Sequence, residues 1–244
     1  MGYHSIIYIF LFLPVCLFVY QLAPEKWRGR VLLGFSWIFF YLLSGKLLVY
    51  LLGTTLLTHC IGIWLTVIRM QEAKAVEGLE RKQKKAVKME YQKKGRRVLA
   101  LGIFILLGIL GYLKYFDFFT VNLSHLFGHP VLEGWRPENL LMPIGISFYT
   151  LQAIGYMTDV YWGTIQAETE IWRTALFLGF FPQIMEGPIA RYSDVADTLY
   201  TGKSLEYRNV VDGYVRIFWG LFKKMVIADR MALMVNQVFD HYAD

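Results

Sequence analysis

Cysteine and charge are scarce in this chain, and each scarcity excludes a class of protein. Its 244 residues contain two cysteines, Cys16 and Cys60, and both lie within apolar stretches. We therefore expect neither a disulfide framework nor a cysteine-based metal site. Only 18% of the residues are charged, against 56% that are hydrophobic, and this balance is typical of a membrane protein. The sequence has no GxSxG and no glycine-rich phosphate loop, so two common enzyme signatures are absent.

The five histidines form no metal-binding pattern. His125 and His129 are four residues apart, but no carboxylate or thiol has matching spacing, and Gly128 and Pro130 interrupt any helix there. We predict no metal site. His59 lies in an apolar stretch, where we expect it to pack between helices.

One block carries most of the excess positive charge. Residues 69–97 hold 11 of the 25 Lys and Arg but 4 of the 19 Asp and Glu, so the block is +7 and the remainder is −1. Such a block between apolar segments predicts a cytoplasmic loop that can also contact anionic membrane lipid. No aromatic-rich binding module accompanies it, so nucleic acid is not an expected partner. The spacing of opposite charges predicts a solvated helix with the pairs Glu77–Arg81, Glu80–Lys84 and Glu90–Lys94.

Several apolar stretches approach or exceed the roughly 20 residues that a membrane-spanning helix needs. They are 5–22, 31–68, 98–116 and 140–162. The second is interrupted at Ser44–Lys46, which predicts a hairpin of two helices, although one long tilted helix also fits. Since the 69–97 block should be cytoplasmic, the first residue and the segment 117–139 are expected outside. Charges interrupt the apolar runs after 170 and leave the later crossings open.

Backbone groups in the hydrocarbon must be satisfied internally, so these stretches should be helices. The fold class we predict is all-α: a polytopic transmembrane helical bundle with broken or re-entrant helices. Residues 1–244 should form a single membrane domain, with the 69–97 loop inside it. The predicted location is the cell membrane, with several passes.

Polar residues follow one face of the stretch 140–163. On a helix, Tyr149, Gln152, Tyr156 and Asp159 continue the spacing that begins at Gly145. A polar stripe is costly against lipid, so it should face the bundle interior or a wet cavity. It can serve interhelical hydrogen bonding alone or line a substrate path.

A helix end and turn are predicted at 181–191, where prolines, a carboxylate and an arginine follow the apolar run FLGFF. Gly187 permits close backbone approach, and Glu186 and Arg191 can neutralise one another. Non-helical backbone at membrane depth needs protein or water around it, so the segment is either a cavity wall or an interfacial loop. Its candidate substrate-path residues are Pro182, Gln183, Glu186, Gly187, Pro188 and Arg191.

Three segments together resemble the membrane-bound O-acyltransferase family, in its alginate O-acetyltransferase-like branch. They are LLMPIGISFYTLQAIGYMTDVYWG (140–163), FFPQIMEGPIARYSD (180–194) and FWGLFKKMVIAD (218–229). Members of that branch also begin with a span containing FLFLP, here 10–14, and the D-alanyl transferases of teichoic acid synthesis share a looser version. The resemblance extends over essentially the whole chain, and PIGISFY with FP-x4-GP-x2-R is a specific combination.

The resemblance implies a multi-helix enzyme with a tunnel through the membrane. Such enzymes take an acyl group from a cytoplasmic donor, here acetyl-CoA, and pass it to a hydroxyl of a cell-surface polysaccharide. No bound cofactor is implied, and an extracytoplasmic partner acyltransferase often completes delivery. Pro182, Gly187, Pro188 and Arg191 match the family pattern and would shape a broken-helix wall of the tunnel, whereas Glu186 is a weaker match.

The family's catalytic histidine, a general base, lies in the second half of its longer members, and none of the five histidines here occupies that position. The expectation is therefore an N-terminal half that is inactive alone. The alternative from another class is a non-catalytic membrane scaffold or a transporter component of a cell-envelope complex. Inverted repeats would favour a transporter, and none is evident. The acceptor polymer and the oligomeric state stay open.

Overall fold

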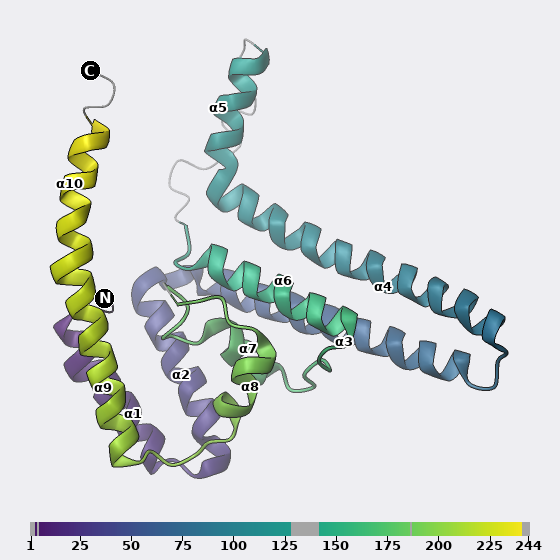
Figure 1. The fold of residues 1–244 in the computed structure, drawn as a ribbon, viewed down its shortest axis with the longest axis horizontal. Coiled ribbons are helices and arrows are strands. Elements are labelled where there is room, and N and C mark those ends of the chain that lie inside the picture. Colours follow the sequence, from purple (N-terminus) through teal and green to yellow (C-terminus); the bar gives the residue numbers. More distant parts are fainter. Residues whose placement is uncertain (1–2, 4, 128–141, 186, 241–244) are drawn as a thin grey trace. The chain divides into compact units, whose positions relative to one another are not determined.

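The computed structural model describes residues 3, 5–127, 142–185 and 187–240. Every regular element in these ranges is a helix (Figure 1), which confirms the all-α prediction. The chain divides into two compact units. The smaller combines Met1–Glu25 with Lys203–Asp244, and the larger is Lys26–Gly202. The prediction of a single membrane domain stays a prediction.

The larger unit contains the long apolar helices. Two helical runs, Glu25–Val76 and Arg81–Phe127, are long and apolar enough to cross a membrane. They indicate a membrane protein, while the number of crossings stays a prediction. The helices of this unit are α2 (Glu25–Ser44), α3 (Leu48–Val76), α4 (Arg81–Leu110), α5 (Phe116–Phe127), α6 (Ile146–Trp162), α7 (Ile171–Gly179) and α8 (Tyr192–Tyr200).

The predicted break between the two arms of 31–68 is confirmed. The chain leaves α2 at Ser44 and makes one 3₁₀ turn, Gly45–Leu47, before α3 begins. Gly45 has φ 55°, in the left-handed region that glycine adopts without a Cβ penalty. The direction of the chain changes there (Figure 1), so a single long helix is not formed.

Helices α3, α4 and α6 pack on one another and form the centre of this unit. Small residues bring them close, as is usual between membrane helices. A Cβ added to Gly102 of α4 would lie 3.1 Å from Met157 Sδ of α6 and 3.3 Å from the side chain of Ile61 in α3. A Cβ at Gly62 would lie 3.2 Å from the ring of Tyr156. Neither position has room for a larger side chain without movement of its neighbours.

Helices α7 and α8 pack against α2. Leu33 of α2, Leu176 of α7 and Leu199 of α8 belong to one buried apolar cluster. The start of α2 is tied to the end of this region because buried Arg28 donates from Nη1 to the carbonyl oxygen of Gly202 at 2.7 Å. At nine residues each, α7 and α8 are too short to span a bilayer.

The predicted solvated helix over 69–97 is wrong in its middle. Helix α3 ends at Val76, Gly78 has φ 80°, and α4 begins at Arg81, so residues 77–80 form a turn. A left-handed glycine ends a helix, and the predicted pair Glu77–Arg81 falls across this break. Glu80 is the N-cap of α4, so its pairing with Lys84 stays a prediction. The third is confirmed: Lys94 Nζ lies 2.8 Å from Glu90 Oε1, with both side chains exposed.

The smaller unit pairs the N-terminal helix with a long C-terminal one. The predicted first span contains a π-helical turn, Tyr8–Phe12, followed by α1 (Leu13–Leu22), and this helix is shorter than the long apolar runs of the larger unit. Its crossing of the membrane stays a prediction. The other part is α9 (Tyr207–Phe222) and α10 (Asp229–Asp240), joined by a π-helical turn.

Two left-handed glycines bracket α6. Gly145 precedes its first turn with φ 70°, and Gly163 follows its last turn with φ 77°. The space where Gly163 would carry a Cβ is taken by the guanidinium of Arg69 from α3. Arg69 Nη1 also donates to the carbonyl oxygen of Val160 at 3.5 Å. The chain cannot continue helically past either glycine, so the ends of α6 are fixed.

The two segments that the sequence singled out meet at Gly145. A Cβ at this position would collide with the carbonyl oxygen of Ile184. Both segments are held by serines of α2, because Ser44 Oγ accepts from the N–H of Ile144 at 3.1 Å and Ser36 Oγ accepts from that of Phe181 at 3.3 Å. The start of α6 and the turn after α7 therefore form one fixed junction.

We predict that Gly145→Ala destabilises this junction. The substitution adds a Cβ at positive φ and against a backbone carbonyl, which should cost about 1–3 kcal/mol. Loss of helical circular dichroism on heating, in detergent, should occur at a clearly lower midpoint. Gly155→Ala is the matched control in the same helix, since a Cβ there meets no atom of another described segment within 4 Å. Equal midpoints for the two variants would contradict the close contact at Gly145.

Candidate functional site

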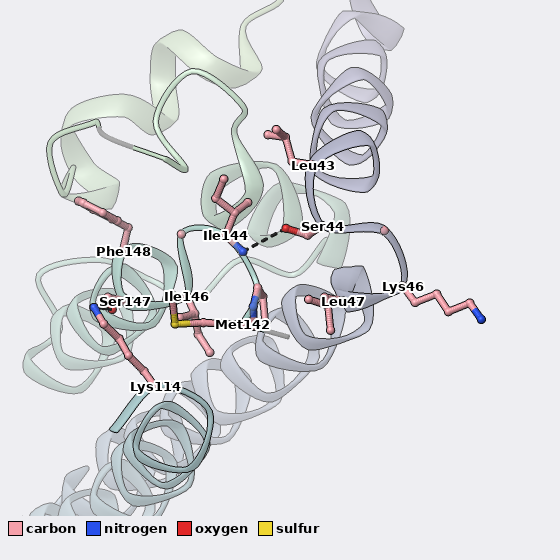
Figure 2. A pocket seen from close by; sticks show the side chains of 13 residues that line it. Leu43, Ser44, Lys46, Leu47, Lys114, Met142, Ile144, Ile146, Ser147 and Phe148 are labelled. Carbon is pink, nitrogen blue, oxygen red and sulfur yellow. Dashed lines mark hydrogen bonds between the residues drawn. The ribbon is translucent and has the colours of Figure 1, made fainter. Parts of the chain in front are cut away.

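A pocket of about 710 Å³ lies where the turn after α2, the end of the α4 run and the start of α6 converge. Figure 2 shows its wall, which contains the whole segment MPIGISF (142–148). The side chains around it are mainly apolar. Its lining comprises Leu43, Ser44, Gly45, Lys46, Leu47, Lys114, Met142, Pro143, Ile144, Gly145, Ile146, Ser147 and Phe148.

Lys114 is the cation that faces the start of α6. Its Nζ donates to Ser147 Oγ at 3.0 Å, whereas the Lys46 side chain points away from the pocket (Figure 2). Lys114 lies in a π-helical turn, Gly111–Tyr115, inside the apolar span 98–116. Single π-helical turns inside α-helices are frequent at functional sites. Our sequence analysis missed Lys114, although a lone charge within an apolar span is itself a signal of function.

A hydrogen bond holds the non-helical part of the pocket wall in place. Residues 142–145 precede α6 and present backbone, and the hydrogen bond between Ser44 and Ile144 holds that backbone against α2. Next to it are the apolar side chains of Leu43, Met142 and Phe148. An apolar space with the ammonium group of Lys114 and the hydroxyls of Ser44 and Ser147 suits a ligand that carries an anionic group or hydroxyls at one end.

The predicted polar stripe of α6 is buried, as expected, for three of its four members: Tyr149, Gln152 and Tyr156. Gln152 Nε2 donates to the carbonyl oxygen of Phe177 at 3.1 Å, and Tyr156 Oη accepts from the N–H of Glu168 at 2.8 Å. These two residues take part in packing between segments. The hydroxyl of Tyr149 is buried and has no hydrogen-bond partner among the described residues.

The last residue of the stripe, Asp159, is half-buried near the other end of α6. None of the predicted substrate-path residues is among the described residues that line the pocket. The pocket and the stripe are instead successive parts of the same segment, 142–160. A role for the stripe in a substrate path stays a prediction.

The second predicted group lies on the turn between α7 and α8. Helix α7 ends at Gly179 and α8 begins at Tyr192, which confirms the predicted helix end and turn. Gly187 makes the expected close approach, because its Cβ would lie 2.6 Å from Gln183 Cα. Gln183 is half-buried, and the side chains of Pro182, Pro188 and Arg191 are exposed. Glu186, the predicted partner of Arg191, lies outside the described residues, so that pairing stays a prediction.

A second polar cluster, which our sequence analysis also missed, surrounds Glu168 in the connection from α6 to α7. Tyr192 donates its hydroxyl hydrogen to Glu168 Oε1. Arg173 lies 3.5 Å from Glu168 Oε2 and 3.1 Å from Glu170 Oε2. Tyr200 donates to the carbonyl oxygen of Arg173 at 2.7 Å. These contacts tie α7 and α8 to the end of α6.

Burial raises the pKa of Tyr192, and its hydrogen bond to Glu168 raises that pKa further. Burial also raises the pKa of Tyr200. Both phenols therefore stay neutral and keep donating at physiological pH. His59 of α3 reaches the neighbouring Thr174, with Nδ1 3.3 Å from Oγ1, which agrees with its expected packing role. The cluster around Glu168 connects helices to one another, whereas the pocket at the start of α6 has space for a ligand.

The described residues contain no group of three His, Cys, Asp or Glu side chains that could hold a metal ion. His129, the second member of the spaced histidine pair, lies outside the described residues, whereas His125 is on α5.

Comparison with known proteins relates almost the entire chain to alginate O-acetylases. The probable alginate O-acetylase AlgI of Pseudomonas putida is 30% identical over 239 residues, which are 98% of this chain and 45% of that protein. The corresponding protein of Pseudomonas aeruginosa is 29% identical over 98% of this chain and 42% of its own length. The chain therefore spans less than half the length of these relatives.

A peptidoglycan O-acetyltransferase of Helicobacter pylori is also similar, at 31% identity over 168 residues, or 58% of this chain and 31% of that protein. No protein-family profile matches the chain. No solved structure matches it either. The chain is thus related over nearly its whole length to the alginate O-acetylases, and its resemblance to the membrane-bound O-acyltransferase family is confirmed.

Proposed function

We propose that this chain is the N-terminal part of a multi-pass O-acetyltransferase of the cell membrane. The enzyme would transfer an acetyl group from a cytoplasmic donor, acetyl-CoA, to a hydroxyl of a cell-surface polysaccharide. The observation that carries the proposal is the match of 98% of the chain to alginate O-acetylases. The names of the relatives specify both alginate and peptidoglycan, so we propose the class of acceptor and not one polymer.

The position of the pocket supports this direction of transfer. With the basic 69–97 block placed in the cytoplasm, the turn after α2, the end of the α4 run and the start of α6 all fall on the opposite side of the membrane. The pocket would then open where an extracellular acceptor arrives. An extracytoplasmic partner acyltransferase would complete delivery to the polymer.

The residues of this chain would bind and orient the acceptor. In the reaction, the acceptor oxygen attacks the thioester carbonyl carbon of the donor, the C–S bond breaks, and coenzyme A leaves as its thiol. A histidine base outside this chain would remove the hydroxyl proton. Lys114 would hold an anionic group or hydroxyl of the acceptor. The buried hydroxyl of Tyr149 has no partner among the described residues, and an unsatisfied group of this kind costs about 1–3 kcal/mol of stability. A ligand group or water that bonds to this hydroxyl would therefore stabilise the protein.

Lys114→Ala should weaken acceptor binding in the intact protein that carries this chain. Loss of one charge-assisted hydrogen bond, about 1.5 kcal/mol, should raise KM for the polysaccharide about tenfold with little change in kcat. The measurement is transfer of radiolabelled acetate from acetyl-CoA into added polysaccharide by membranes. Lys114→Arg should restore part of the affinity.

Lys203→Ala is the control, because Lys203 is exposed and lies far from the pocket in the sequence, in the smaller unit. Unchanged kinetics in Lys114→Ala would remove the pocket from the acceptor path. A fall in kcat at unchanged KM would assign Lys114 to the chemical step.

Residues 1–244 produced alone should transfer no acetyl group, since the proposed base is absent from them. The same membranes supplied with the intact protein provide the positive control. Detectable acetylation by residues 1–244 alone would place the base within this chain and would make His59 the first residue to replace.

A further inference from the structure

A second groove, of about 410 Å³, lies between α3 and α4 and plays no part in the proposed acceptor path. Its inner wall is apolar. Ile68 of α3 and Val98 of α4 are buried at its base, while Trp64 and Leu101 are 51% and 48% exposed at its sides. A tryptophan that is half exposed on a membrane helix is typical of the interface between hydrocarbon and headgroups. The groove can therefore hold apolar chains.

One end of the same groove is basic. Gln71 of α3 and the exposed side chains of Lys94 and Arg97 of α4 complete its lining. Arg97 has no ion-pair partner among the described residues. Lys94 pairs with Glu90 at 2.8 Å, but both side chains are more than half exposed, so this pair is weak. A net positive charge stays available at this end.

The apolar and the basic side chains of the groove are separated along the helices, and the basic ones lie nearer the end that is predicted to be cytoplasmic. On α4, Lys94 and Arg97 are nearer the 77–80 turn and Leu101 is farther from it, and on α3 Gln71 is nearer that turn than Trp64. From Lys94 to Leu101 the helix rises by about 10 Å. That distance is comparable to a phospholipid headgroup and the first part of its chains. The basic end lies within the +7 block that is predicted to be cytoplasmic.

We propose that the groove between α3 and α4 binds an anionic phospholipid of the cytoplasmic leaflet. Its phosphate and headgroup would lie between Lys94 and Arg97, with Gln71 as an uncharged hydrogen-bonding group. Its chains would run along Trp64, Ile68 and Leu101. Basic pockets between membrane helices on the cytoplasmic side recognise anionic headgroups in this way. This site shares no lining residue with the pocket at the start of α6. An experiment can therefore disprove the lipid site without disproving the proposed function, and the reverse also holds.

The test is native mass spectrometry of the intact protein purified in detergent, titrated with phosphatidylglycerol or with phosphatidylcholine of the same chains. We expect phosphatidylglycerol to bind more tightly. The double variant Lys94→Gln/Arg97→Gln should lose roughly thirtyfold in affinity for phosphatidylglycerol, since each basic side chain near an anionic headgroup contributes about a fivefold factor. Affinity for phosphatidylcholine should change little.

The matched control, Lys85→Gln/Lys88→Gln, removes the same charge from exposed positions of the same helix outside the groove. It should keep the preference for phosphatidylglycerol. Leu101→Trp fills the groove without altering charge and should also lower affinity for phosphatidylglycerol. Equal binding of both lipids by the unmodified protein would overturn the proposal. So would equal losses in the two double variants, because they would indicate attraction to the basic block as a whole.

Discussion

The arrangement of the larger unit depends on how non-helical backbone between packed helices finds hydrogen-bond partners. Two serines of α2 provide them. Ser36 and Ser44 are eight residues apart, about two turns, and so lie on the same face of the helix. One accepts from the N–H of Phe181 and the other from the N–H of Ile144. Without these hydroxyls, the buried N–H of Phe181 and the half-buried N–H of Ile144 would each lose a partner, which is costly in an apolar surrounding. The start of α6 and the turn after α7 are thus fixed to one helix and to each other.

The pocket at the start of α6 and the groove between α3 and α4 are separate parts of the larger unit. The pocket is lined by the end of α2, the 3₁₀ turn before α3, the π-helical turn after α4 and the start of α6, and the groove lies nearer the basic turn between α3 and α4. Both combine apolar walls with one cationic end. The two share no lining residue, so a substitution in one leaves the lining side chains of the other in place.

Much of the fold could be predicted because its signals are local. The interruption at Ser44–Lys46 and the prolines after FLGFF each act on their own stretch of backbone, and both breaks occur where expected. The placement of Gly145 on the helix was wrong, because this glycine is left-handed and α6 begins one residue later. The site was harder because its contacts join distant residues. Lys114 and Ser147 are 33 positions apart, and Tyr192 and Glu168 are 24 apart. A spacing rule for one helix contains no information about such pairs. The break at Gly78 was missed for the opposite reason, because the charge pattern across it continued.

The two glycines that bracket α6 fix its length, and that length has a mechanical consequence. Seventeen residues rise by about 25 Å, whereas the hydrocarbon of a typical bilayer is about 30 Å thick. A helix that crosses the membrane with this deficit cannot place both of its ends in water unless the bilayer thins or protein surrounds those ends. Here the pocket wall surrounds one end, and the Arg69 guanidinium covers the other. If α6 crosses the membrane, the barrier between the two compartments would be thinner along this helix than in the membrane around it. In the proposed reaction, this would shorten the distance between the donor and the acceptor.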